Sequence, residues 1–380
     1  MGEILEKAIR VRRKLHKWPE LSREQFETSA FIRKELEALG IEVQEGYSGT
    51  SLVALIRGAK PRATIALRAD IDALPVQEIS NNEYRSERQG VMHACGHDGH
   101  IAMLLGAAEA IMKDRNKLEG NVKLIFQSAE EIYGGAEVLV KEGVLDNPKV
   151  DSIYALHLWP SVPKGSIGVK EGVLMASNAR FKVEVKGSSA HGAMPHLGKD
   201  ALVTAAEIVG SLQNIVSRGI NPTDAAVLTI GKFNSGTEYN IIPGEATLTG
   251  TVRTVSSELE EEIRGRMEAV VEGVAKAGGC TAVLDFVKQY PATINAKSAI
   301  AVARRVISKE FGENSILESL TPNMAAEDFS FYLQNTPGAM LFLGTGDKIF
   351  NKPLHHGSFD FDESVMETGI KLLYSLAMNN

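Results

Sequence analysis

The spacing of apolar and polar residues predicts that the chain begins with helices and then alternates short strands with helices. Apolar residues recur at helical spacing over Ile4–His16 and Glu24–Leu39, and Gly40 follows the second pattern. Short apolar runs come next, in the order SLVALI, ATIALRAD, VKLIFQSAEE and SIYALHLWP, with helical stretches such as Ile101–Met112 between several of them. This alternation predicts an α/β domain with a mixed, mainly parallel sheet between helices.

The pattern changes after Ala179. The run RFKVEVKG alternates like a half-exposed strand, a helix pattern covers Asp200–Ser217, and strands follow at AVLTIGKF and EATLTGTVRT. A charged helix over Ser256–Ala277 and the run TAVLDFVKQYP complete a β-α-β-β-α-β order, which is that of a ferredoxin-like α+β unit. Because α/β character then returns, we expect one domain formed by residues 1–178 and 292–380, with residues 179–291 inserted as a second domain.

Composition restricts the class of protein. The 380 residues exceed the usual size of one compact domain, and a hydrophobic fraction of 44% is sufficient for a folded core. The net charge of −7 gives no basic surface for nucleic acid or anionic membranes, and no apolar run resembles a signal peptide or a membrane span. The only cysteines, Cys95 and Cys280, argue against a disulfide framework. We therefore expect a cytoplasmic protein that binds neither nucleic acid nor a membrane.

The nine histidines are unevenly distributed along the chain. Apart from His16, they fall into four groups at strand and loop ends: His93, His97 and His100; His157; His191 and His196; His355 and His356. Imidazole groups that gather beside other potential ligands favour a metal site.

The stretch MHACGHDGH is the densest of these groups. His93 and His97 are four residues apart, but Ala94 stands where the helical zinc-protease motif H-E-x-x-H requires Glu, and Gly96 stands where a helix former is expected. Gly96 instead places Cys95 and His97 on a loop before a helix that we expect Asp98 to cap. Considered alone, the segment is also compatible with a buried cysteine beside a capping aspartate.

Three further segments carry polar residues at strand or loop ends. In FQSAEE, one of two adjacent carboxylates could bind a metal while the other, Glu130, transfers protons, although such a pair is usually a solvated loop. His157 follows an apolar strand, where a histidine is more often a hydrogen-bonded core residue. His355 and His356 lie on a loop flanked by Pro and Gly.

These segments together suit two cations better than one. If a cysteine bridged the two ions, each would have three protein ligands and open positions for water and substrate. Two close cations lower the pKa of a shared water and polarise a carbonyl, so the set favours hydrolysis. The candidate ligands are Cys95, His97, Glu131, His157 and His355.

The chain resembles the aminoacylase-like metallo-amidohydrolases, which include hippurate hydrolase, N-acetyl-diaminopimelate deacetylase and indoleacetyl-amino-acid hydrolases. The motifs follow the family's order over nearly the whole chain: LRADIDALP, MHACGHDGH, FQSAEE, ALHLWP, LMAS, GSSAHGAMPH, YNIIP, GTVRT, AEDFSFY and LHHGSFDFDE. The resemblance implies a dimetal peptidase-like catalytic domain, here residues 1–178 and 292–380, and an inserted lid or dimerisation domain, here 179–291.

The resemblance also implies a role for each candidate ligand. Cys95 corresponds to the bridging ligand, His97 and His157 complete one metal site, and Glu131 and His355 complete the other. The expected metals are two divalent ions, Zn, Mn, Ni or Co.

The same resemblance implies that Glu130 is the general base and that Asp70 orients a metal ligand from outside the coordination shell. Arg68 stands where the wider peptidase clan has a ligating histidine, so the partner of Asp70 is open. The chain also has Ser128 and Gly357 where the family usually has proline, which we expect to alter loop stiffness without loss of chemistry.

Three residues of the inserted domain match substrate-contacting positions of the family. His191 corresponds to a histidine that stabilises the oxyanion, in some relatives from a neighbouring subunit, so a homodimer or homotetramer is expected. Asn240 and Arg253 correspond to residues that bind the backbone and carboxylate of the substrate.

The expected activity is hydrolysis of the amide bond of N-acyl L-amino acids by a metal-activated water, with Glu130 as base. Three alternatives stay open at this point. The same centre could act as a dipeptidase or carboxypeptidase, Cys95 could be a nucleophile beside His97, or the protein could bind metal without activity.

Overall fold

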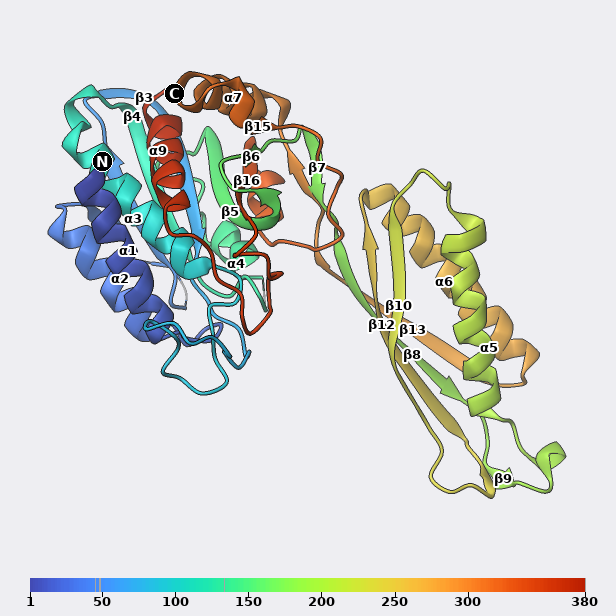
Figure 1. The fold of residues 1–380 in the computed structure, drawn as a ribbon. Helices are drawn as coiled ribbons and strands as arrows, with labels where there is room; N and C mark the ends of the chain where they lie inside the picture. Colours follow the sequence, from blue (N-terminus) through green and yellow to red (C-terminus); the bar gives the residue numbers. More distant parts are fainter. Residues whose placement is uncertain (45, 48, 133, 380) are drawn as a thin grey trace. The chain divides into compact units, whose positions relative to one another are not determined.

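The computed structural model describes residues 1–44, 46, 47, 49–132 and 134–379, and the chain divides into two compact units (Figure 1). Unit 1 comprises Met1–Leu174, Ile294–Thr321 and Asp328–Asn380. Unit 2 comprises Met175–Thr293 and Pro322–Glu327. From the sequence we expected the divisions at 178/179 and 291/292. We expected Pro322–Glu327 to belong to the first domain. In unit 2, the amide of Ala176 donates hydrogen bonds to carbonyl oxygens of this segment.

Unit 1 is built on an eight-stranded mixed sheet with the order β1-β2-β4-β3-β5-β16-β6-β15. The pairs β3–β4, β3–β5, β5–β16 and β6–β15 are parallel, whereas β1–β2, β2–β4 and β6–β16 are antiparallel. This confirms the predicted mixed, mainly parallel sheet. The strands are β1 (Glu42–Gln44), β2 (Leu52–Arg57), β3 (Lys60–Asp70), β4 (Glu119–Gln127), β5 (Ser152–Pro163), β6 (Ile167–Gly168), β15 (Ile316–Leu317) and β16 (Gly338–Gly346).

Helices pack on this sheet, and α3 is the most deeply buried of them. Its sequence is apolar on all sides over the run IAMLLGAA, every residue of which is buried, because it packs against α1, α9 and strand β3. The helices of unit 1 are α1 (Gly2–Lys17), α2 (Phe26–Ala38), α3 (His97–Lys113), α4 (Gly135–Lys141), α7 (Lys297–Phe311), α8 (Ser330–Leu333) and α9 (Val365–Met378), with 3₁₀ turns η1 (Arg115–Lys117) and η4 (Glu313–Ser315). No helix in the described part of the chain is long and apolar enough to cross a bilayer.

Unit 2 has a four-stranded antiparallel sheet with two helices packed on it, as the predicted ferredoxin-like order requires. The sheet order is β10-β12-β8-β13, and its core gathers apolar side chains from alternate strand positions and from both helices. The elements are β8 (Asn178–Lys186), α5 (Ala201–Asn214), β10 (Ala226–Ser235), β12 (Glu245–Thr254), α6 (Ser257–Ala277) and β13 (Thr281–Tyr290).

Smaller elements complete the two units. A two-stranded ribbon pairs β9 (Ala190–His191) with β11 (Ile241–Ile242), and a second pairs β7 (Gly172–Met175) with β14 (Thr293–Asn295). A 3₁₀ turn η2 (Pro195–Leu197) follows β9, and a π turn η3 (Ile215–Gly219) follows α5.

The parallel strands of unit 1 bring the candidate site together. Strands β4, β3 and β5 are neighbours and run in the same direction, so their carboxyl ends meet at one edge of the sheet. Asp70 is the last residue of β3, Glu130 and Glu131 follow β4, and His157 lies within β5. Residues distant in sequence therefore converge at this edge.

Candidate metal centre

Among the groups of potential metal ligands in the described part of the chain, two in unit 1 share Cys95. The ligand atoms of Cys95, His97 and His157 lie within 4.8 Å of one another, as do those of Cys95, Glu131 and His355. Cys95 Sγ is 3.6 Å from His157 Nε2, and Glu131 Oε1 is 3.4 Å from His355 Nε2. The structure thus brings together all five candidate ligands.

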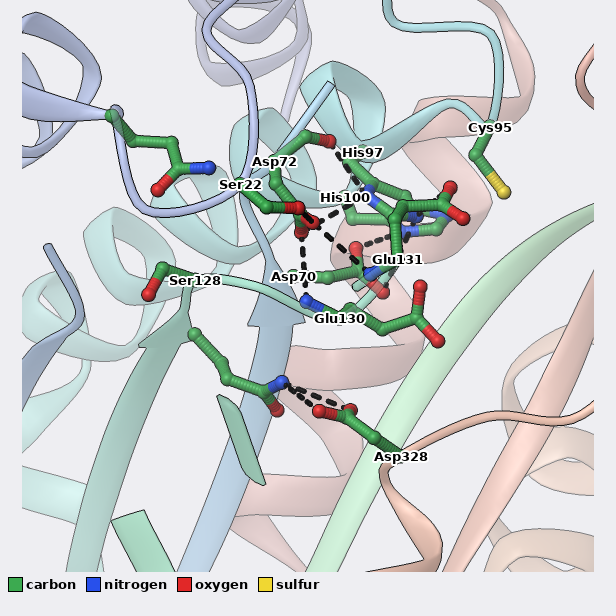
Figure 2. Close-up of polar contacts among 12 residues, drawn as sticks. Ser22, Asp70, Asp72, Cys95, His97, His100, Ser128, Glu130, Glu131 and Asp328 are labelled. Carbon is green, nitrogen blue, oxygen red and sulfur yellow. Dashed lines mark hydrogen bonds and ion pairs between the residues drawn. The ribbon is translucent and has the colours of Figure 1, made fainter. Parts of the chain in front are cut away.

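The two groups differ in exposure. Cys95, His97 and His157 are buried, whereas the His355 side chain is 52% exposed. Glu130 is buried beside them, and its carboxylate lies within 4.8 Å of ligand atoms of His97 and Glu131. Figure 2 shows the two glutamates on consecutive positions of the loop after β4. The arrangement has a closed side at His157 and an open side at His355.

Backbone hydrogen bonds fix the tautomers of two histidines. His97 Nδ1 is 2.8 Å from the carbonyl oxygen of Asp72, and His157 Nδ1 is 2.8 Å from the carbonyl oxygen of Leu158. A carbonyl only accepts, so each Nδ1 must carry a proton, and in the neutral ring Nε2 then has the lone pair. These are the orientation and tautomer of a metal-binding imidazole.

The donor atoms fit a cation. His97 Nε2 and Glu131 Oε1 are buried and have no hydrogen-bond partner among the described residues. A buried polar atom without a partner is costly, and two such atoms facing one small volume are readily explained by a bound ion. Thiolate, imidazole and carboxylate groups together suit Zn, Ni, Co or Mn.

The electrostatics of the centre also favour a cation. Burial alone would lower the pKa of His97, but the surrounding carboxylates of Asp70, Glu131 and Asp72 raise it to about 10. Burial and the charges of Glu131 and Glu130 raise the pKa of the Cys95 thiol well above its usual value. A nucleophilic cysteine needs a lowered pKa, so this environment disfavours the nucleophile alternative.

Backbone strain is concentrated in the same loops. Ala129, directly before the glutamate pair, has φ of 62°, and His355 has φ of 64°. Residues with a Cβ rarely adopt this conformation because it costs free energy. Such strained residues are found most often at functional sites. The amide of Gly135 donates to the carbonyl of Ala129, and the amide of His355 donates to the carbonyl of Ala94, so hydrogen bonds hold both strained residues.

Asp70, whose partner the sequence left open, binds His100 and Arg68. Its Oδ1 is 2.6 Å from His100 Nδ1, and its Oδ2 accepts from Arg68 Nη1 at 2.6 Å. His100 Nε2 in turn accepts the amide of Leu158 at 3.0 Å. Both ring nitrogens of His100 are therefore used, and it links Asp70 to the backbone beside His157 instead of offering a ligand atom. Asp70 Oδ2 also lies 3.7 Å from His97 Nε2.

Arg68 extends this network across the sheet. Its Nη2 donates to Asp328 Oδ1 at 3.0 Å and its Nε to Gln127 Oε1 at 2.9 Å, all in buried surroundings. Burial raises the pKa of Asp328 to about 6 despite the charge of Arg68. Arg68, which stands where the wider clan has a ligating histidine, is thus held in a buried polar network that includes Asp70.

The expectation that Asp98 caps the following helix is wrong. Gly96, with φ of 84°, precedes α3, and no side chain caps its first turn. Asp98 is fully buried and accepts hydrogen bonds from Arg12 Nε and His16 Nδ1, each at 2.8 Å. The buried guanidinium attracts the carboxylate more strongly than the helix amides do.

His93 and His356, which had no predicted role, lie outside the two ligand groups. His93 is buried, neither ring nitrogen has a hydrogen-bond partner among the described residues, and burial lowers its pKa to about 4. His356 Nδ1 accepts the amide of Ser358 within its own loop.

The two positions where the family usually has proline show local reasons for their residues. The amide of Ser128 donates to Ser51 Oγ at 3.1 Å, a bond that proline lacks the hydrogen to make. At Gly357, a Cβ atom would lie 2.4 Å from the carbonyl oxygen of Gln77.

Sequence reasoning missed Asp72 and Ser22. Asp72 is fully buried, and its carboxylate accepts the amides of Glu130 and Glu131 and the hydroxyl of Ser22 (Figure 2). These bonds and the neighbouring His97 outweigh burial and lower the pKa of Asp72. The available signal was a second acidic residue two positions after Asp70, at the end of a buried strand.

The three candidate substrate residues all belong to unit 2. His191 is exposed on β9, where it pairs with Ile241 of β11, and the amide of Gly192 donates to the carbonyl of Asn240. Asn240 is also exposed, so these two lie on one ribbon. Arg253 lies on β12 opposite Val227, half-buried, and burial lowers its pKa.

The sequence of the chain matches a known family and known proteins. The chain matches the model of peptidase family M20/M25/M40 over residues 66–379. It is 40% identical to an N-acetyl-L-cysteine deacetylase of Bacillus subtilis, over 99% of this chain and 89% of that protein. It is 37% identical to thermostable carboxypeptidase 1 of Saccharolobus solfataricus, over 97% of this chain and 93% of that protein.

A solved structure extends the likeness to three dimensions. The YXEP protein of Bacillus subtilis, described as a dinuclear metal-binding peptidase of the M20 family, superposes with a TM-score of 0.88 at 34% identity, covering 100% of this chain and 99% of that one. The predicted enzyme class and the aminoacylase-like resemblance are thereby confirmed. The chain belongs to peptidase family M20/M25/M40 and is a hydrolase.

Proposed function

We propose that this hydrolase cleaves the amide bond of N-acyl amino acids, such as N-acetyl amino acids, and releases a carboxylic acid and an amino acid. The observation that carries the proposal is the pair of three-residue ligand groups that share Cys95, with the Glu130 carboxylate beside them. The relationship to an N-acetyl-L-cysteine deacetylase supports the choice of substrate class.

Two divalent cations, Zn, Mn, Ni or Co, would be held by these groups. Cys95, His97 and His157 would bind one, and Cys95, Glu131 and His355 would bind the other. When bound, such a pair lowers the pKa of a water and polarises the acyl carbonyl.

Glu130 would move the protons of the reaction. Its carboxylate is buried and lies within 4.8 Å of ligand atoms on His97 and Glu131, so it can face a water in the same volume. It would accept a proton from the attacking water and return that proton to the leaving amine. The carboxylate of Asp72 accepts the backbone amides of both glutamates, which fixes the backbone from which the two side chains extend.

Residues of unit 2 would recognise the substrate. His191 would stabilise the oxyanion of the tetrahedral intermediate, Asn240 would bind the substrate backbone, and Arg253 would bind the carboxylate of the amino acid. The exposure of His191 and Asn240 on one ribbon supports a role in contacting a ligand. A homodimer or homotetramer and a cytoplasmic location stay predictions from the sequence.

A second candidate is cleavage of dipeptides or of carboxyl-terminal residues by the same centre. The relationship to a thermostable carboxypeptidase favours this alternative. Turnover of matched N-acetyl, N-benzoyl and dipeptide substrates, measured with each of the four metals, separates the two. Higher kcat/KM for the N-acyl substrates supports the proposal, and higher kcat/KM for dipeptides supports the alternative.

The role of Glu130 is tested by Glu130→Gln, which keeps the shape of the side chain and removes its basicity. We expect kcat to fall about 10²–10⁴-fold, the usual contribution of general acid–base catalysis, while the metal content stays that of the wild type. Glu137→Gln, on the exposed surface of α4 a few residues later, is the matched control and should keep full activity. Near wild-type turnover by Glu130→Gln would show that another group is the base.

A further inference from the structure

The sheet of unit 2 has one face covered by helices and one open face. Helices α5 and α6 pack on the covered face (Figure 1), where Phe181 of β8 and Val252 of β12 are buried among their apolar side chains. Side chains alternate along a strand, so the residues between these buried ones belong to the opposite face. On that face the side chains of Val283 and Val287 of β13 are exposed. The open face is therefore accessible to a ligand.

Two arginines are neighbours on this open face. Arg180 of β8 is directly opposite Thr251 of β12, and Arg253 is two residues further along β12. Both arginines alternate with buried core residues, so both side chains extend from the same face. Diagonal neighbours on one face of an antiparallel pair lie about 7–8 Å apart, a distance that long side chains can bridge. The two guanidinium groups can therefore reach one small ligand.

Neither guanidinium group is neutralised by an acidic side chain. Among the residues that the structure describes, neither Arg180 nor Arg253 has a hydrogen bond or ion pair to a carboxylate. Arg253 is half-buried, and burial alone lowers its pKa. Two acidic residues of the same face lie beside Lys182 instead, since Glu184 is ion-paired with it at 2.8 Å and Asp285 is directly opposite it. A half-buried cation without a counter-ion is costly, so the surplus positive charge favours an anionic ligand.

We propose that Arg180 and Arg253 together select N-acyl amino acids that carry a second carboxylate on the side chain, such as N-acyl glutamate. Arg253 binds the α-carboxylate, as in the proposed function, and Arg180 binds the side-chain carboxylate. Each guanidinium group can hold a carboxylate through two parallel hydrogen bonds. This inference rests on the proposed function and narrows its substrate class.

The charge of the pair favours two carboxylates over one. A single carboxylate would leave one guanidinium group without a counter-ion, whereas the two carboxylates of an acidic amino acid, joined by a few carbon atoms, neutralise both. The exposed side chains of Val227 and Val287 lie directly opposite Arg253 and Arg180. Apolar surface thus borders the arginine pair on both sides, and a less polar environment strengthens an ion pair.

The substitution Arg180→Gln tests the assignment, because it removes the charge and keeps a polar side chain on an exposed strand position. The measurement is kcat/KM for N-acetyl-L-glutamate and for N-acetyl-L-glutamine, which has nearly the same shape and no side-chain charge. We expect the wild type to favour the glutamate compound about 10- to 100-fold, the usual effect of hydrogen bonds to a charged group. Arg180→Gln should remove most of this preference, and Arg180→Glu should reverse it.

A second readout does not depend on hydrolysis. L-Glutamate and L-glutamine, the amino acids released from the two substrates, are titrated calorimetrically into the Co²⁺-loaded protein. We expect the wild type to bind glutamate more tightly and Arg180→Gln to bind both with similar affinity. Arg218→Gln is the matched control, because it makes the same change of charge at an exposed arginine of η3, outside the sheet. It should keep the wild-type preference in both measurements.

The outcomes for the arginine pair and for the proposed function are distinguishable. A wild type with equal kcat/KM for the charged and the uncharged compound would overturn the inference, as would a preference that Arg180→Gln retains. If the wild type hydrolysed no N-acyl amino acid, the proposed function would fail instead. Tighter binding of glutamate that is lost in Arg180→Gln would then still support the arginine pair as a dicarboxylate site.

Discussion

His157 and His100 carry the same side chain, and their hydrogen bonds give them different roles. His157 donates Nδ1–H to a carbonyl, so its Nε2 faces the sulfur of Cys95 with a free lone pair. His100 is bonded at both nitrogens, to Asp70 and to the amide of Leu158. The partners come from strands β3 and β5, so spacing within MHACGHDGH could not distinguish a ligand from a linking histidine.

The buried His16 gives the protein a pH-dependent contribution to stability. Its Nδ1 is 2.8 Å from Asp98 and its Nε2 is 3.4 Å from Glu78. Burial and the charge of Arg12 lower the pKa of His16, but Asp98 and the hydrogen bonds to both carboxylates outweigh them, so the pKa is raised. Protonated His16 therefore adds stability that is complete below the unfolded pKa of about 6.5 and is lost as pH rises through the folded pKa.

We predict that His16→Gln lowers the free energy of unfolding more at about pH 6 than at alkaline pH, because only the wild type gains from a protonated imidazole. Denaturant unfolding of both proteins across this range measures the difference. His196→Gln, at an exposed histidine outside this buried network, serves as control. A pH-independent effect of His16→Gln would contradict the assignment of its charge.

At the scale of elements, two predicted helix patterns begin close to where the helices begin, and in both helices the capping residue is partly exposed. Asp200 accepts two amides at the start of α5, and Ser256 accepts one at the start of α6, close to the predicted boundaries. Asp98 has the same cap-forming side chain, but it lies in the core. There the charge of Arg12, 86 residues away in sequence, determines its partner. A side chain with a propensity for helix capping therefore caps a helix where it is partly exposed, and binds a charged partner instead where it is buried.

The loop that carries His355 depends on a close approach at Gly357. The amide of Ile79 donates to the Gly357 carbonyl at 2.8 Å, and a Cβ at Gly357 would lie 2.4 Å from the Gln77 carbonyl oxygen. A backbone oxygen cannot yield like a flexible side chain, so one of the two segments would have to move.

We predict that Gly357→Ala destabilises the protein by about 1–3 kcal/mol, the usual range for overpacking, and weakens metal binding through His355. Thermal unfolding with and without Co²⁺ measures both effects. Gly273→Ala, on α6 with open space around the Cβ position, is the control and should be neutral or slightly stabilising. Unchanged stability of Gly357→Ala would mean that the loop adapts without strain.

At the scale of the molecule, the fold class could be predicted because the spacing of hydrophobic residues in each short segment indicates a strand or a helix. The five candidate ligands could be selected because Cys, His and Glu stood out at strand ends in a family-like order. Asp72, Ser22 and the Arg68 network could not, because their importance arises only when β3, β4 and the segment before α2 meet. Asp72 accepts backbone amides, and Arg68 binds side chains from distant parts of the chain, so spacing within one motif does not reveal these partners.

The central claim is that Cys95 is shared by two cations, and metal stoichiometry of purified variants tests it most directly. We predict that the wild type binds two divalent ions per chain, one through each ligand group. His157→Ala and His355→Ala should each retain one, and Cys95→Ala should lose tight binding of both. Elemental analysis after dialysis against each metal gives the counts. A wild type that binds a single ion, or a Cys95→Ala variant that keeps two, would contradict the shared-cysteine centre.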